Sequence, residues 1–253
     1  MSNTGRVALI TGATSGIGRA TAIELASHGD FVIVSGRDKQ RAEETCDAIR
    51  DVGGECAVVL ADLTDVASTE DLARGALAAG NGRVDIIVNN AGGALFDDGN
   101  QFKLTAAVSP AEYERVFALN ARAPFQLTAA LAPTMVEHGG GSIINILALS
   151  ADLGVPGVSV FGGAKAAVAS FTRTWAVEFA PAVRVNAIDL GAIDTPIHAN
   201  NQEMLASLTP TIPAQRLGRS EEVASVVAFL ASDAASYVSG VVLPVDGGRL
   251  ITF

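Results

Sequence analysis

The chain has 253 residues, of which 49% are hydrophobic and 17% are charged, and its formal net charge is −10 at pH 7. This length fits one α/β domain over residues 1–253, and the acidic balance argues against nucleic acid and anionic membranes, which bind basic faces. Two cysteines without paired Cys/His spacing argue against a disulfide framework or a metal site. With neither a signal peptide nor a membrane-spanning run, we expect a cytoplasmic protein.

Short apolar runs alternate with longer stretches of helical spacing along the whole chain. The apolar runs lack polar alternation, which is typical of a parallel sheet covered by helices on both faces. Strands are expected near 7–11, 31–35, 56–60, 84–89, 142–147, 183–189 and 240–245, and helices near 16–28, 38–52, 65–80, 110–137, 158–180 and 220–231. The irregular segments 93–109 and 191–219 follow strand ends, where loops over a parallel sheet carry sites.

A glycine-rich turn joins the first expected strand to the first helix, and it reads Thr-Gly-Ala-Thr-Ser-Gly-Ile-Gly from Thr11 to Gly18. Gly12 lets the chain turn, and Gly16 removes a side chain that would block a pyrophosphate. Gly18 lets the helix pack closely against the strand. Because the free N–H groups of the first helical turn point at an anion, this turn predicts a dinucleotide site.

The end of the second expected strand bears on the choice of cofactor. Arg37 favours the extra phosphate of NADP, since a guanidinium binds phosphate in a bidentate manner. Asp38 could instead hold the ribose hydroxyls of NAD, but a helical run follows it and we expect it to cap that helix. We therefore predict NADP as the preferred cofactor and NAD as the alternative; otherwise Arg37 is a solvated surface arginine.

A second polar signal, Asn89-Asn90-Ala91-Gly92, ends the fourth expected strand. It could be a simple turn, since Asn and Gly both tolerate turn geometry. However, it lies at the same edge of the sheet as the glycine turn, so the two signals support each other.

These motifs resemble those of the short-chain dehydrogenase/reductase family over nearly the whole chain. The resemblance rests on Thr11–Gly18, Asn89–Gly92, Asn120, Lys165, Thr195 and the ending Gly240 to Gly248. It implies a single-domain Rossmann fold with a doubly wound, seven-stranded parallel sheet. It also implies that the cofactor is NAD(P)H and that hydride is exchanged with a carbonyl or alcohol. The resemblance further implies a homo-oligomer, with four chains in a tetramer.

The resemblance also assigns residues to the cofactor. Asp62 and Leu63 would border the adenine, and Asn89, Ala91 and Gly92 would line the ribose and nicotinamide side. Ile193 and Thr195 would hold the carboxamide and the pyrophosphate, and Lys165 would hold the nicotinamide ribose. The expected phosphate and cofactor residues are completed by Gly12, Ser15, Gly16, Ile17, Gly18 and Arg37.

The catalytic segment departs from the family pattern, in which a tyrosine precedes the lysine by four residues and a serine lies about a dozen residues further upstream. Phe161 occupies the tyrosine position and Ala148 the serine position, whereas Asn120 and Lys165 are present. Phenylalanine has no proton to give a nascent alkoxide, and alanine cannot hydrogen-bond the substrate oxygen. Leu190 also replaces a proline that the family usually has.

We therefore expect an oxidoreductase with an altered proton donor, such as water held by Asn120 and Lys165, acting on a small molecule. Other polar groups that could act instead are Ser150, Asp152, Ser159, Asp189 and His198. The alternatives are a catalytically inactive or non-redox NAD(P)-binding protein (a sensor or scaffold), a different enzyme on the same fold, or a chain altered to abolish activity.

Overall fold

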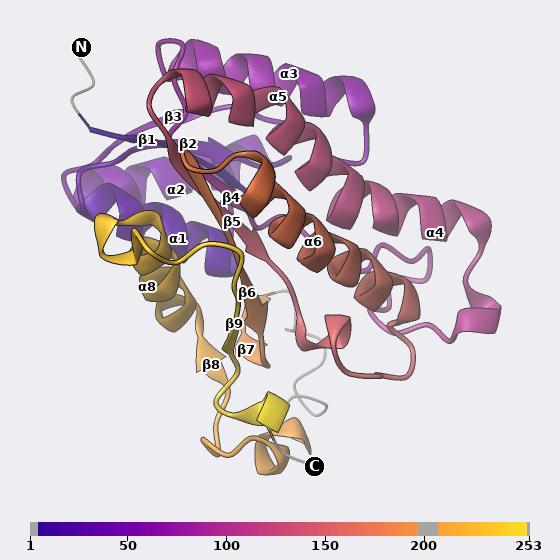
Figure 1. Ribbon diagram of the computed structural model, residues 1–253. Helices are drawn as coiled ribbons and strands as arrows, with labels where there is room; N and C mark the ends of the chain where they lie inside the picture. The colour runs from indigo at the N-terminus through magenta and orange to yellow at the C-terminus, as the bar shows by residue number, and fades with distance from the viewer. Residues whose placement is uncertain (1–4, 197–206, 252–253) are drawn as a thin grey trace.

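The computed structural model describes residues 5–196 and 207–251, and its centre is a seven-stranded parallel sheet in the order β3-β2-β1-β4-β5-β6-β9 (Figure 1). Its strands are β1 (Val7–Thr11), β2 (Phe31–Ser35), β3 (Glu55–Val58), β4 (Ile86–Asn89), β5 (Gly141–Ile146), β6 (Val183–Leu190) and β9 (Val242–Val245). Every neighbouring pair is parallel, which confirms the predicted doubly wound Rossmann sheet.

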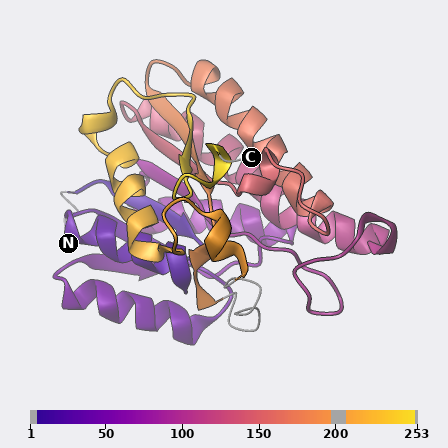
Figure 2. The same ribbon diagram turned by 90° about the horizontal axis from the view of Figure 1, so that it is seen from below.

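Helices cover both faces of this sheet, because its buried strands are apolar on both sides. The helices are α1 (Gly16–Ser27), α2 (Lys39–Asp51), α3 (Val66–Ala79), α4 (Pro110–Phe117), α5 (Ala123–Glu137), α6 (Ser159–Glu178) and α8 (Ser220–Ala231). Side chains of α1, α2 and α8 share one core cluster, and those of α3, α5 and α6 share the other. Figures 1 and 2 show these two layers on opposite sides of the sheet.

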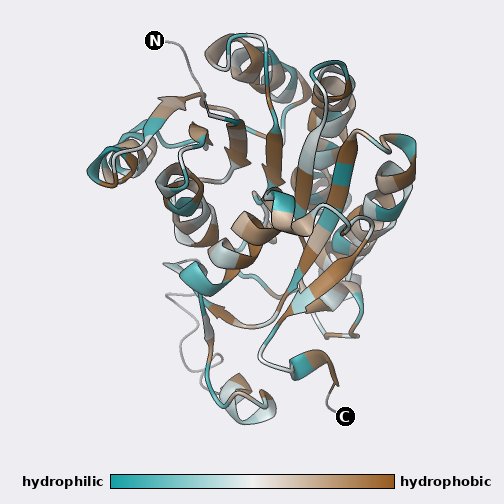
Figure 3. Cartoon of the chain, turned by 60° about the vertical axis from the view of Figure 1, so that its left-hand side comes forward, coloured by the Kyte–Doolittle hydropathy of each residue, from teal (hydrophilic) through white to brown (hydrophobic). Residues whose placement is uncertain are grey.

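The core is built from the strands and from the inner faces of the helices. Figure 3 shows hydrophobic colour along the central strands and hydrophilic colour on outward-facing parts of the helices. Local signals start several helices as the sequence predicts: Asp38 accepts a hydrogen bond from the Arg41 N–H and so caps α2. Ser109 and Glu112 form a capping box around the start of α4, whose first helical residue is Pro110.

The helix expected over 110–137 differs from the prediction, because a π-helical turn, Ala118–Arg122, separates α4 from α5. Two features favour this wider turn. Pro124 has no N–H for the carbonyl four residues earlier, and the Asn120 side chain donates to the Val116 carbonyl at 2.8 Å. The turn places Asn120 in the helix wall that faces the end of β4.

The segment 191–219, expected to be irregular, contains a short parallel pair formed by β7 (Ile193–Asp194) and β8 (Gly218–Arg219). The predicted candidate His198 lies outside the described residues. No helix in the described part of the chain is both long and apolar enough to traverse a bilayer.

Candidate functional site

A cavity of about 810 Å³ runs along the carboxyl ends of the strands, across the neighbouring strands β1 and β4, between which the strand order reverses. It is lined by most of the predicted site residues: Gly12, Ser15, Gly16, Ile17, Gly18, Arg37, Asp62, Leu63, Ala91, Gly92, Ala148, Phe161, Lys165, Ile193 and Thr195. The fold therefore brings together residues that are up to 183 positions apart in the chain. Asn89 and Asn120 do not line the cavity.

The glycine turn has a backbone that requires glycine at two positions. Gly12 and Gly16 have φ values of 65° and 50°, in the left-handed region that other residues rarely adopt. Thr195 lies against Gly16, so a Cβ at Gly16 would be 3.4 Å from the Thr195 side chain. Ser15 caps α1 without a side-chain hydrogen bond, which leaves the first-turn N–H groups to face the cavity.

Asn90, which sequence reasoning did not single out, holds this turn in place. Its amide nitrogen donates to the Thr11 carbonyl at 2.8 Å and to the Gly12 carbonyl at 3.3 Å. The preceding residue, Asn89, points away from the cavity and donates to Asn145 Oδ1 on β5 at 2.8 Å. Successive side chains of a strand point to opposite sides, so Asn90 meets the predicted cofactor site and Asn89 supports it from behind.

Arg37 lines the cavity beside Asp62, and its positive charge contributes to holding the pKa of that carboxyl below its ordinary value. The larger causes of this lowered pKa are the hydrogen bonds that Asp62 accepts from the Thr64 backbone and hydroxyl. A second arginine, Arg41 of α2, also lines the cavity. Asp38 is engaged in capping α2 and does not line the cavity.

Asn120 is fully buried and positions the turn that follows β4. Its amide nitrogen donates to the Gly93 and Val116 carbonyls at 2.8 Å each, and its oxygen accepts from the Gly93 N–H at 3.0 Å. Both amide hydrogens are thus used within the protein. The Asn120 side chain therefore has no free N–H for a catalytic water.

Lys165 projects from α6 to the floor of the cavity and is 4% exposed. Its ammonium donates to the Ile146 carbonyl at 2.8 Å and lies 5.6 Å from the centre of the Phe161 ring. Burial lowers the pKa of Lys165 to about 8, because desolvation disfavours the charged form. The site thus contains an ammonium whose proton is exchangeable near neutral pH.

Phe161 belongs to an apolar cluster that crosses from α6 to the 93–109 segment. The ring packs against Phe96, Val116 and Val160, whose side chains are all buried. Ser150 also lines the cavity, and its buried hydroxyl has no hydrogen-bond partner among the described residues. Ser159 does not line the cavity; its hydroxyl is 2.9 Å from that of Thr105.

Asp189 lies behind the cavity on β6 and is fully buried, and neither carboxylate oxygen has a hydrogen-bond partner in the described structure. Burial is the main cause that raises its pKa to about 7, and the carboxyls of Asp152 and Asp246 add to the effect. Asp189 does not line the cavity, so it has no direct access to a substrate there.

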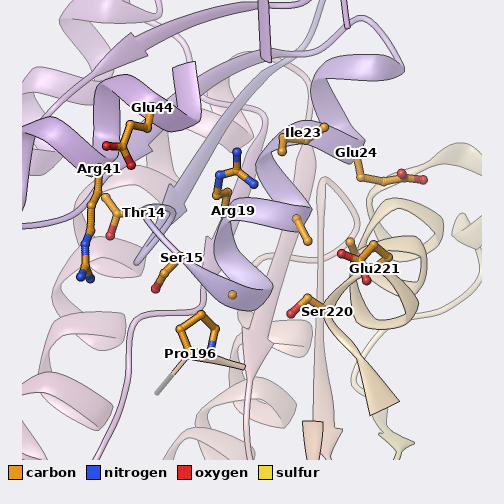
Figure 4. Close-up of a pocket in the computed structure, with 13 residues that line it drawn as sticks. Thr14, Ser15, Arg19, Ile23, Glu24, Arg41, Glu44, Pro196, Ser220 and Glu221 are labelled. Carbon is orange, nitrogen blue, oxygen red and sulfur yellow. The ribbon is translucent and has the colours of Figure 1, made fainter. Parts of the chain in front are cut away.

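A second cavity of about 680 Å³ lies on the outer side of the glycine turn, between α1 and the start of α8 (Figure 4). Arg19 and Glu24 of α1 face it, together with Ser220 and Glu221 of α8. The two cavities share lining residues of the turn and Arg41. Its mixture of arginine and glutamate side chains does not favour an anion, unlike the first cavity, where Arg37 adjoins the glycine turn.

The first cavity fits an extended dinucleotide. Glycine at Gly12 and Gly16 leaves space for a phosphate in front of the α1 N–H groups. Arg37 lies at one end of the cavity, and Lys165 on α6 lies at the other. A Cβ at Gly92 would be only 3.0 Å from the Lys165 ammonium, so this glycine keeps the approach to Lys165 open.

The chain is similar to known proteins in both sequence and structure. Residues 12–249 match the family model described as enoyl-(acyl carrier protein) reductase. The chain is 34% identical to the 3-oxoacyl-[acyl-carrier-protein] reductase FabG of Thermotoga maritima, over 98% of each chain. It is 40% identical to a solved short chain dehydrogenase/reductase family protein, with a TM-score of 0.88 and full coverage of both chains.

A further solved structure bears on the cofactor. It is that of a candidate NAD(P)-dependent gluconate 5-dehydrogenase from Beutenbergia cavernae, with NADP bound at low occupancy. The chain is 38% identical to this protein over 98% of each chain, with a TM-score of 0.90.

Proposed function

Because the chain belongs to the short-chain dehydrogenase/reductase family of oxidoreductases, we propose that it interconverts a carbonyl compound and an alcohol with NADP(H), in an active site that lacks the family's tyrosine and serine. The observation that carries the proposal is the retained Lys165, buried beside the Phe161 ring with a lowered pKa.

The residues expected to hold the cofactor form two groups, one at each end of the cavity. The α1 N–H groups and Ser15 would bind the pyrophosphate, while Asp62 and Leu63 would border the adenine. Lys165 would hold the nicotinamide ribose, and Ile193 and Thr195 would complete the nicotinamide end. When bound, NADPH supplies the hydride that adds to the carbonyl carbon.

We propose that Lys165 supplies the proton. As the carbonyl carbon gains the hydride, the C=O π electrons move to the oxygen, which takes a proton from the Lys165 ammonium. The neutral amine then regains a proton from water. A donor with a pKa of about 8 suits this role, because general acid catalysis works best when the pKa is near the operating pH. Asn120 acts as a positioning residue for the Gly92–Gly93 turn.

NADP is proposed as the preferred cofactor because Arg37 lines the cavity, and its side chain makes no hydrogen bond among the described residues that would compete with a phosphate. A guanidinium binds a phosphate group more strongly than a ribose hydroxyl. Asp38, which could have selected NAD, is engaged in capping α2.

The second candidate is a non-redox protein that binds NAD(P) without turnover, and the absence of hydroxyls at Phe161 and Ala148 favours it. A tyrosine general acid contributes about 10²–10⁴-fold to the rate, and one hydrogen-bond donor to the substrate oxygen about 10²–10³-fold. The two candidates differ in whether Lys165 replaces enough of this contribution.

Steady-state reduction of a broad panel of carbonyl compounds with NADPH and NADH tests the proposal, alongside oxidation of the matching alcohols. We expect slow turnover by the wild-type protein and a rate at least about tenfold higher for the Phe161→Tyr, Ala148→Ser double variant. Cofactor binding without turnover by either protein would reject the oxidoreductase and support the non-redox alternative.

We also propose that the protein is a homotetramer and that it is located in the cytoplasm. An aromatic group of Phe125, Phe171 and Trp175 on α5 and α6 supports association, and Phe125 is 48% exposed. Large apolar side chains left in water on one face favour an interface with another chain.

A further inference from the structure

The part of the cavity beyond Lys165 has a predominantly apolar wall. Leu95 and Phe102 come from the 93–109 segment, while Leu153, Val155 and Val158 come from the segment before α6. Phe161 continues this wall from α6. Arg249 also lines the cavity, but it already interacts with another group of the protein.

One buried carboxylate holds the 93–109 segment in place. Glu112 on α4 is 0% exposed, and its Oε1 accepts hydrogen bonds from the Lys103 ammonium at 2.6 Å and the Asp97 N–H at 2.9 Å. Its Oε2 accepts from the Ser109 N–H at 2.8 Å. Glu112 therefore fixes this segment at three positions along its length.

Lys103 connects this anchor to the apolar wall. Its backbone N–H donates to the Gly157 carbonyl at 2.7 Å, which joins the segment to the loop before α6. The neighbouring Phe102 lies close to Gly157, where an added Cβ would be 3.2 Å from the Phe102 Cβ. The Lys103 ammonium lies 5.9 Å from the centre of the Phe96 ring, which belongs to the cluster that contains Phe161.

The anchor keeps both charges over the ordinary pH range. The Lys103 hydrogen bond, followed by those from Ser109 and Asp97, lowers the pKa of Glu112 to about 2. The Glu112 carboxylate in turn raises the pKa of Lys103 above its usual value. The 93–109 segment is thus held as a preformed wall, and the geometry of Phe102 depends on an interaction that does not touch the cavity.

Resting on the proposed carbonyl reduction, we infer that this wall selects a neutral, apolar carbonyl or alcohol, and that Glu112 is the positioning residue that sets this selectivity by holding Lys103 and Phe102. A charged substrate would lose hydration against the apolar side chains of this wall, and none of the six side chains named above carries an opposite charge. An apolar one would gain from burial against it.

Dead-end binding tests this inference without requiring turnover. Protein saturated with NADP⁺ is titrated with 4-methylcyclohexanone or with 2-oxobutanoate in a calorimeter, since an oxidised cofactor cannot reduce either ketone. We expect the cyclic ketone to bind at least about tenfold more tightly than the keto acid. Equal or tighter binding of the keto acid would overturn the inferred selectivity.

The variants Glu112→Gln and Lys103→Met test the positioning role. Each is expected to raise the Kd of 4-methylcyclohexanone at least about fivefold, while the Kd of NADP⁺ changes less than twofold. Lys103→Arg should keep the wild-type affinity, because it preserves the charge, and Asp47→Asn, which breaks a distant exposed ion pair with Arg50, is the matched control. Phe102→Ala removes one side chain of the wall directly and should also weaken binding of the ketone.

Folded Glu112→Gln and Lys103→Met proteins that bind NADP⁺ and the ketone as the wild type does would overturn the positioning role. A wild-type protein that binds the ketone but shows no turnover would contradict the proposed reaction and leave the apolar selectivity supported. A protein that does not bind NADP⁺ at all would overturn both.

Discussion

At the scale of single residues, the chemistry depends on which group gives up a proton beside Phe161. If Lys165 is the donor, reduction needs its ammonium form, whose pKa is about 8 in the free protein. We predict that kcat/KM for NADPH-dependent reduction falls about tenfold per pH unit above about pH 8. The measurement is a pH profile from 6 to 10. A profile that stays flat to pH 10 would exclude Lys165 as the donor, and Lys165→Met should abolish the reaction.

Arg37 gives a second prediction at this scale, because its guanidinium is proposed to bind the extra phosphate of NADP. Arg37→Gln should raise the Kd of NADP⁺ about 10- to 100-fold and leave the Kd of NAD⁺ almost unchanged, since a charge-assisted hydrogen bond contributes about 1.5–3 kcal/mol. Fluorescence titration with both cofactors measures this. Arg19→Gln, at an exposed arginine that lines the second cavity (Figure 4), is the control. Unchanged NADP⁺ affinity in Arg37→Gln would reject the assignment.

Asp189 predicts how stability depends on pH. Its pKa is raised to about 7 in the folded protein by burial and by the carboxyls of Asp152 and Asp246, against an ordinary value of 3.8. The folded state therefore holds this proton more tightly, and the stability that it gives is complete below about pH 4 and is lost as the pH rises through 7. Asp189→Asn should match the wild type near pH 4 and be more stable at pH 8.

The size of this effect is at most a few kcal/mol, since one pKa unit corresponds to about 1.4 kcal/mol. Urea denaturation at pH 4 and pH 8 measures it through the free energy of unfolding. Asp47→Asn, at an exposed aspartate of α2, is the control and should show no comparable pH-dependent gain. A variant that is less stable than the wild type at pH 8 would show that the Asp189 carboxylate has a stabilising partner.

At the scale of elements, the site depends on the contact between the end of β4 and the glycine turn after β1. Asn90 makes this contact through the Thr11 and Gly12 carbonyls. Asn90→Ala should lower the free energy of unfolding by about 1–3 kcal/mol, because these partly buried carbonyls lose their donor, and should weaken cofactor binding as the turn loosens. Asn100→Ala, at an exposed loop residue, is the control. Wild-type affinity and stability in Asn90→Ala would contradict this role.

At the scale of the whole molecule, the aromatic group on α5 and α6, which is exposed at Phe125, predicts self-association. Phe125→Asp places a charge in this group, next to Phe171 at 5.6 Å and Trp175 at 6.2 Å between ring centres. We expect the wild type to be a tetramer at micromolar concentration and Phe125→Asp to shift it toward smaller species. Light scattering coupled to size exclusion measures the mass, and Glu137→Gln on the same helix is the control. A monomeric wild type would reject the predicted assembly.

The sequence alone determined the sheet and the helix layers, because their causes are local. Apolar runs without alternation specify strands covered on both faces, and residues such as Asp38 and Ser109 start helices through hydrogen bonds to nearby N–H groups. The glycine turn could also be predicted from the sequence, because Gly12 and Gly16 adopt left-handed conformations that few other residues can adopt.

Only the tertiary structure decided which polar groups face the cavity and which form hydrogen bonds within the protein instead. The sequence could not show that Asn120 donates both amide hydrogens to the Gly93 and Val116 carbonyls. It also could not show that Asn90, rather than Asn89, contacts the glycine turn. Nor could it show Glu112 reaching three separate donors. Hydrogen bonds between distant segments depend on where the folded backbone brings their donors and acceptors, and no local pattern in the chain records that distance.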